Sequence, residues 1–120
     1  MKRWISFFVL FSIGILPAFA ADYPDQFVAG PTIYKQIFDN DRTRASEITF
    51  QVGEKIPMHT HAYDHLLYVL DAGQLTLSYP DGKTNVVDAT VGQVMYIPKE
   101  THAAENTGTG VFRALVVEFK

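Results

Sequence analysis

GEKIPMHTHAYDHLLYVLDAG, residues 53–73, carries three of the four histidines in this chain of 120 residues. His59, His61 and His65 fall within seven residues, and the apolar run 66–70 follows at once. Imidazole is the commonest neutral nitrogen ligand for transition metals, so this clustering indicates a metal site. Because side chains alternate faces along a strand, His59 and His61 point the same way if the segment is extended.

The fourth histidine, His102, lies in a second segment, GQVMYIPKETHAAEN over residues 92–106, after another short apolar run. We expect the four histidines to converge on one divalent ion, which could be Zn, Cu, Fe, Mn or Ni. The chain contains no cysteine, so nitrogen and oxygen atoms must hold that metal. The competing interpretation is a set of surface or loop histidines that bond to water.

Residues 1–20 have the pattern of a cleavable secretory signal peptide. Residues 1–3 form a basic head, residues 5–16 are apolar, and Ala18 and Ala20 are the small residues that a signal peptidase reads. The competing interpretation is an uncleaved anchor, but the apolar run is shorter than the ~20 residues needed to span a bilayer. We therefore expect a Sec-type signal, a single mature domain over residues 21–120 and a periplasmic or secreted protein.

The charge of the mature domain argues against two classes of partner. Without Lys2 and Arg3 the formal charge of the chain falls from −3 to −5, and no basic stripe is present. We therefore expect neither nucleic acid nor, after signal cleavage, a membrane as the partner.

The mature chain shows no convincing helical period and many short runs with period-two alternation. The predicted strands are residues 32–38, 42–52, 65–70, 74–79, 84–89, 94–97, 101–105 and 111–119. Seven to nine short strands separated by turn signals predict an all-β sandwich or barrel. Residues 66–70 and 111–117 are apolar on both faces, which predicts a second covered surface. The simplest such surface is a homodimer interface, formed by sheet packing or by edge exchange with the arm over residues 21–40.

Two motifs of the chain resemble those of the cupin superfamily. The first reads Gly53, five residues, His59-Thr60-His61, three residues and then His65, where the family has glutamate. The second reads Gly92, five residues, Pro98, His102, three residues and Asn106, with one residue fewer before His102 and Glu100 in place of the family's glycine. The resemblance covers most of the mature chain. It implies a jelly-roll barrel, a double-stranded β-helix, with a metal bound in its mouth.

The resemblance also implies roles for the histidines. His59, His61 and His102 match the family's three histidine ligands, and His65 matches its glutamate ligand by position only. Neutral imidazole supplies neither the negative charge nor the proton acceptor that glutamate supplies. The site is therefore more similar to thiol and diketone dioxygenases, which have three or four histidines, than to oxalate-degrading cupins.

Two alternatives remain open at the fourth ligand position. His65 could orient another ligand instead of binding the metal itself. Asp64 could supply a replacement carboxylate, but on an extended segment neighbouring residues face opposite ways, so only one of the two points at the metal.

Several other side chains fit a binding site. Candidates to line an apolar pocket are Met58, Tyr63, Tyr68, Tyr96 and Phe112, although such residues are more often ordinary core. Arg42, Arg44 and Arg113 could hold a carboxylate substrate by a bidentate pair, although surface arginines need no such role.

These features predict an exported metal-dependent enzyme, most simply an O2-using oxidoreductase that acts on a small organic molecule. Fe(II), Mn(II) or Cu(II) would serve that chemistry, whereas an all-nitrogen ligand set by itself favours copper or zinc. One alternative is a non-catalytic module that holds a metal or small ligand. Another is a structural cupin whose histidines bind nothing.

Overall fold

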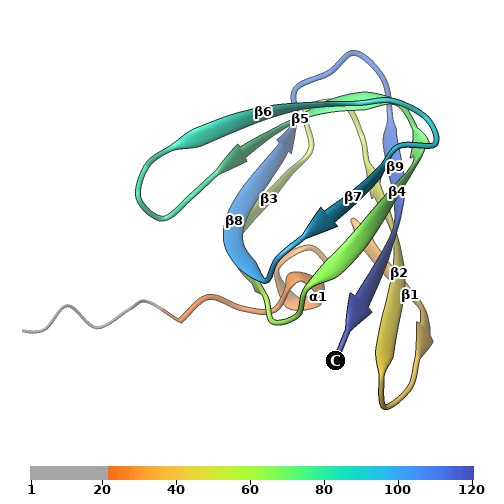
Figure 1. Cartoon of the computed structure of the whole chain (residues 1–120). Helices are drawn as coiled ribbons and strands as arrows, with labels where there is room; N and C mark the ends of the chain where they lie inside the picture. The colour runs from red at the N-terminus through yellow and green to blue at the C-terminus, as the bar shows by residue number, and fades with distance from the viewer. Residues whose placement is uncertain (1–21) are drawn as a thin grey trace, which may run out of the picture.

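The computed structural model describes residues 22–120, which form nine strands and one short helix (Figure 1). In chain order the elements are α1 (Gln26–Ala29), β1 (Tyr34–Asp39), β2 (Thr43–Phe50), β3 (Lys55–His61), β4 (His65–Asp71), β5 (Gly73–Ser78), β6 (Thr84–Ala89), β7 (Val94–Ile97), β8 (Glu100–Asn106) and β9 (Phe112–Phe119). The predicted signal peptide lies outside the described residues. Within those residues, no helix has the length and hydropathy needed to cross a membrane.

The strands make two antiparallel sheets that enclose a common core (Figure 1). The five-stranded sheet has the order β1-β2-β9-β4-β7, and the four-stranded sheet has the order β3-β8-β5-β6. Most neighbours are therefore distant in sequence, as in a jelly roll and unlike a simple meander. The prediction of an all-β domain is confirmed.

Turn chemistry explains where the β5–β6 hairpin reverses. Residues 79–83 separate the two strands, and Gly82 takes the left-handed conformation there, with φ of +84°. Lys83 donates its backbone N–H to the Asp81 side chain at 2.9 Å, which stabilises the turn. The sequence Pro80-Asp81-Gly82-Lys83 is typical of such a turn.

The sequence did not predict α1, because four residues are too few to show a helical period. Its start is nevertheless encoded locally, since the Asp25 side chain accepts a hydrogen bond from the Phe27 backbone N–H at 2.9 Å. A second difference is at β8, which begins at Glu100, one residue earlier than expected. Glu100 therefore lies two residues before His102 on the same strand, and both side chains face the same way.

The interior is layered along the strands. On β9 the buried side chains are, in order, Phe112, Ala114, Val116 and Glu118, and their partners across β2 are Phe50, Ile48, Ser46 and Arg44. Aromatic and aliphatic residues thus fill one end, whereas an ion pair occupies the other. β4 continues the polar layer, because His65 pairs with Glu118. This layering places the histidines at the polar end of the barrel.

Candidate metal centre

Three imidazoles converge at the polar end of the barrel. His59 and His61 lie on β3, and His102 lies on β8 directly opposite His59 in the antiparallel pairing. Each ring offers one nitrogen, and these three nitrogens lie within 4.8 Å of one another. All three residues are buried, with at most 7% of their surface exposed. The group could hold a metal ion.

Hydrogen bonds orient two of the three rings. The Nδ1–H of His59 donates to the Pro57 carbonyl at 2.8 Å, and the Nδ1–H of His102 donates to the Glu100 carboxylate at 2.7 Å. A neutral imidazole that donates from Nδ1 presents an unprotonated Nε2, which is the form that binds a metal. Both rings are therefore held in the ligating tautomer by groups outside the ligand set.

The spacing of the nitrogens also suits a metal. The Nε2 atoms of His59 and His61 are 3.1 Å apart. Two nitrogens, each ~2.1 Å from one ion at a near-tetrahedral or right angle, are about 3.0–3.4 Å apart. The Nδ1 of His61 is buried without a hydrogen-bond partner, so no group outside the three histidines orients that ring by a hydrogen bond. The residues present thus fit a divalent ion.

Burial favours the neutral form of His59, His61 and His65. Desolvation lowers the pKa of His59 to about 4 and the pKa of His61 to about 2, and it also lowers the pKa of His65. At pH 7 these three rings are therefore neutral imidazoles, each with one N–H and one unprotonated nitrogen that carries a lone pair.

Of the four histidines expected to converge, His65 lies beside the other three. Its ring stacks on that of His61, with 4.6 Å between centroids and 28° between planes, and its Nδ1 lies 3.2 Å from the Tyr63 carbonyl oxygen. It is not in the converging group, which contains His59, His61 and His102. The arrangement favours the alternative in which His65 positions a ligand ring by packing against it.

Asp64 is not a replacement ligand. Its two carboxylate oxygens accept hydrogen bonds from the Tyr96 hydroxyl at 2.6 Å and from the Lys99 backbone N–H at 2.8 Å. Tyr96 is 59% exposed, so these bonds direct the carboxylate toward solvent. Asp64 and His65 thus face different sides of the chain, as expected for neighbouring residues of an extended segment.

Glu100 is the functional residue whose role sequence reasoning missed. Its carboxylate accepts from His102 and also lines the cavity beside the histidines. The hydrogen bond from His102 holds the pKa of Glu100 below its usual value. The signal was present in the sequence, because a residue two positions before a histidine on a strand shares its face.

A cavity of about 240 Å³ adjoins the centre. His61, His65, His102 and Glu100 line one part of it, and the rest is mainly aliphatic and aromatic. Among the five predicted lining residues, Phe112 lines the cavity.

The other four predicted lining residues do not line the cavity. Tyr68 and Tyr96 project from the outer face of their sheet and are 44% and 59% exposed. Met58 lies where the β3–β8 register shifts, next to the inward-facing His59. Tyr63 lies in the turn after β3, with its ring 5.9 Å from the Arg44 guanidinium. The error arose because residue type was considered without the face of the strand.

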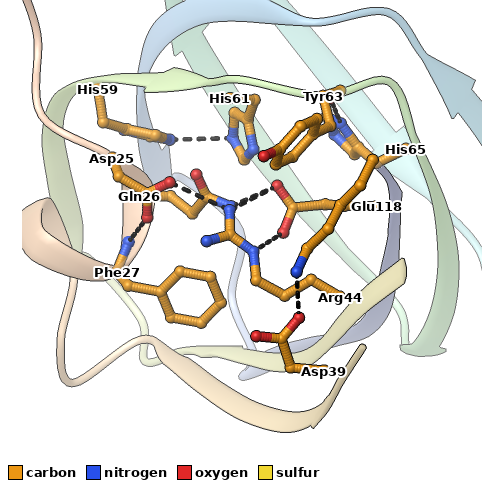
Figure 2. Close-up of polar contacts among 11 residues, drawn as sticks. Asp25, Gln26, Phe27, Asp39, Arg44, His59, His61, Tyr63, His65 and Glu118 are labelled. Atoms are coloured by element: carbon orange, nitrogen blue, oxygen red, sulfur yellow. Dashed lines mark hydrogen bonds and ion pairs between the residues drawn. The ribbon is translucent and has the colours of Figure 1, made fainter. Parts of the chain in front are cut away.

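Beside the histidines lies a buried ionic network, drawn in Figure 2. Arg44 donates to both carboxylate oxygens of Glu118, at 2.6 and 2.9 Å, and to Asp25 at 3.0 Å. Gln26 of α1 donates to Glu118 at 2.7 Å. Glu118 and Gln26 are both 0% exposed. The network joins α1 to β2 and β9 at the polar end.

This network and the surface ion pairs occupy the candidate arginines. Arg44 bonds to Glu118 and Asp25, and Arg113 bonds to Glu47 and Asp71. Neither of them lines the cavity, and neither does the exposed Arg42. These positions agree with the alternative in which the arginines have no role at a substrate.

Comparison with known proteins identifies one family. Residues 46–118 match the family model described as the cupin domain. No curated protein matches the chain significantly.

Solved structures with the same fold cover most of the described chain. A cupin domain from Bordetella pertussis Tohama I is similar with a TM-score of 0.68 and 24% identity, over 84% of this chain and 99% of that one. An RmlC-like cupin family protein with a double-stranded β-helix fold, from Methanocaldococcus jannaschii, has a TM-score of 0.59 and 18% identity, over 83% and 90%. The polyketide cyclase RemF from Streptomyces resistomycificus has a TM-score of 0.55 and 29% identity, over 72% of this chain and 63% of that one.

Arg44→Met should strongly destabilise the protein, because it leaves the buried carboxylate of Glu118 without its cation. We expect the free energy of unfolding in urea to fall by about 3–5 kcal/mol. The matched control is Arg113→Met, whose pair with Glu47 is 39% and 35% exposed and should cost less than about 1 kcal/mol. The double variant Arg44→Met/Glu118→Gln should recover part of the loss. Equal costs for the two single variants would contradict the assignment.

The stability of the metal-free protein should fall as the pH drops from about 6.5 toward 4. An unfolded histidine has a pKa of ~6.5, whereas burial holds the pKa of His59 at about 4 in the fold. Between about pH 6.5 and pH 4, His59 binds a proton in the unfolded chain but not in the folded chain, so a lower pH favours unfolding. Urea midpoints measured from pH 7 to pH 4.5 test this, with His59→Asn expected to flatten the decline. A midpoint that is constant over this range would exclude a neutral buried His59.

Proposed function

The chain belongs to the cupin family, and from that premise we propose an exported metal-dependent oxidoreductase that uses O2 on a small organic molecule. The observation that carries the proposal is the convergence of three buried imidazoles beside a cavity of about 240 Å³. His59, His61 and His102 would hold the ion. When bound, a divalent ion on three neutral ligands supplies Lewis acidity and, if it is redox-active, electron transfer with O2.

The residues around the ligands support a prepared site. Pro57 and Glu100 fix the tautomers of His59 and His102, and His65 restricts the ring of His61 by stacking on it. Such outer partners set ring orientation and ligand basicity. Glu100 also restores to the site a carboxylate that the family's glutamate would have supplied from the position of His65. Here that carboxylate comes from β8 and reaches the centre through His102.

Metal identity follows from the ligand set. Affinity for nitrogen ligands rises from manganese to copper and falls again at zinc, so copper or zinc should occupy an unselective all-histidine site. Exchange of the family's hard carboxylate for imidazole moves the preference further from manganese. Oxidative chemistry then favours copper, or iron where iron is supplied.

Similarity to the polyketide cyclase supports an organic substrate, because that protein is named for action on a polyketide. The share of identical residues is modest, so the support concerns the class of substrate and not the reaction.

A non-catalytic cupin that binds a metal or small ligand is the second candidate. Among the described residues that line the cavity, Glu100 is the one carboxylate, and it is already bonded to His102. No free acid–base pair then faces the cavity within residues 22–120, which favours binding without turnover.

We also propose that the protein is exported and forms a homodimer. Export is supported by the basic head, apolar run and small residues of the first twenty positions. Dimerisation is supported by the outer face of the five-stranded sheet, where Tyr68 pairs with Val94 and with Leu115, and Leu66 pairs with Tyr96 and with Val117. Tyr68, Val94 and Tyr96 are 44%, 59% and 59% exposed. Contiguous apolar surface of this kind marks an interaction site.

Substitution of a histidine that binds the metal should strongly weaken both metal binding and O2 use. We expect His59→Ala, His61→Ala and His102→Ala each to weaken metal affinity by more than about 100-fold, and Glu100→Gln by ~10–100-fold. The control His65→Phe preserves the packing and should retain the metal. Elemental analysis of the exported protein should find mainly copper or zinc, and an oxygen electrode should record uptake with a thiol or diketone.

The outcomes separate the candidates. If all three alanine variants retained the metal, the three histidines would not be its ligands. If the exported protein carried mainly manganese, the predicted preference for copper or zinc would be wrong. Bound metal with no oxygen uptake across a panel of thiols, diketones and small acids would leave the binding module as the function.

The homodimer has its own test. Light scattering at micromolar concentration should give twice the mass of the mature chain, and Tyr68→Glu should reduce the mass to that of a monomer. Val52→Glu is the control, because Val52 is 57% exposed outside this face and its substitution should leave the dimer intact. A monomeric wild-type protein would refute the proposal.

A further inference from the structure

We propose that the cavity selects molecules with one polar head and an apolar body, and excludes molecules with charged groups at both ends. The head would lie at the histidines, and the body would lie between β5–β6 and the strands β4 and β9. The inference rests on the proposed metal centre and narrows its substrate class.

The lining residues of the four-stranded sheet change from polar to apolar along the strands. On β8, Glu100 and His102 come first and Ala104 follows, with Leu77 as its partner on β5. Tyr79 lies at the polar end, with its ring centroid 6.3 Å from that of His102.

Past this polar layer the same sheet is hydrocarbon. Leu75 on β5 pairs with Val87 on β6, and Gly73 pairs with Ala89. Leu75, Val87 and Ala89 all line the cavity.

The opposite sheet changes in the same direction. His65 on β4 pairs with Ile97 on β7, and the next inward residue, Leu67, pairs with Met95. On β9 the lining residues are Val116 and, at the far end, Phe112. The two sheets therefore give the cavity one polar end and one hydrocarbon end.

The charges give the cavity its selectivity. Among its described lining residues there is no lysine or arginine, and Glu100 is the one carboxylate, placed at the polar end. A second charged group on a ligand would be buried against Leu75, Val87 and Phe112 with no partner. Burial of an unpaired charge is strongly unfavourable, so such ligands would be rejected.

Size and access limit the ligand further. The volume of about 240 Å³ exceeds the ~150 Å³ of an engineered apolar cavity that takes benzene, so one ring or a chain of about seven carbons fits. The lining residue Asn85 is exposed, which shows that the cavity meets solvent near the β5–β6 hairpin. A ligand that enters beside Asn85 and Tyr79 can reach both the histidines and the apolar end of the cavity.

Three probes of matched length test the inference by calorimetry on the metal-loaded protein. The probes are heptanoate, heptan-1-ol and the symmetrical dicarboxylate heptanedioate. Heptanoate and heptan-1-ol should bind, and heptanedioate should bind at least about 100-fold more weakly than heptanoate. The dicarboxylate is symmetrical, so each of its two orientations buries a carboxylate at the apolar end. Equal affinity for heptanoate and heptanedioate would overturn the inference.

A pair of adjacent valines supplies the matched variants. Val87 lines the cavity, whereas Val86 is 55% exposed on the other face of β6. Val87→Phe fills the cavity and should weaken both monofunctional probes at least about tenfold. Val86→Phe should leave both affinities unchanged. Thermal unfolding of both variants verifies the fold, and undiminished binding by a folded Val87→Phe would overturn the inference.

The metal-free protein separates this inference from the metal centre. Heptan-1-ol is uncharged and gains little from a bound cation. If it binds to the metal-free protein and this binding is lost in Val87→Phe, the apolar subsite is supported even when the histidines hold no ion. Metal binding without binding of heptanoate or heptan-1-ol would overturn the subsite and leave the metal centre intact.

Discussion

The pairing of β3 with β8 is the contact on which the candidate site depends. It sets His59 opposite His102, so two ligands from distant parts of the sequence meet without relying on a flexible loop. Strand alternation then adds His61 from the same face of β3 and Glu100 from the same face of β8. Because the backbone hydrogen bonds of a sheet fix this register, the separation of the ring nitrogens is a property of the barrel itself.

Electrostatics at the polar end divides into two neighbouring zones. Around the histidines burial favours neutral rings, whose lone pairs suit a cation. Beside them, Glu118 is buried as an ion and is compensated by Arg44 and Gln26. A buried carboxylate without such partners would be strongly unfavourable. Arg44 satisfies it without lining the cavity, so a fixed positive charge does not face a bound ion across open space.

The sequence was sufficient for the elements whose causes are local. Alternation predicted every strand except β3, whose first residues lie in a segment expected to be a loop. Histidine spacing predicted the group that now includes His59, His61 and His102. The sequence was insufficient where packing between distant segments sets the position of a side chain. The stacking of His65 on His61 cannot be read from spacing, and the outward position of Tyr68 and Tyr96 depends on which face of each strand is covered.

The hydrogen bond from Gln26 to Glu118 joins residues 92 positions apart, near the two ends of the described chain. Closing so long a loop carries an entropic cost that the contacts of the fold must offset. Both ends of the described chain are thus held together at the polar end, next to the histidines. Loss of α1 would leave Arg44 as the remaining side-chain partner of the buried Glu118.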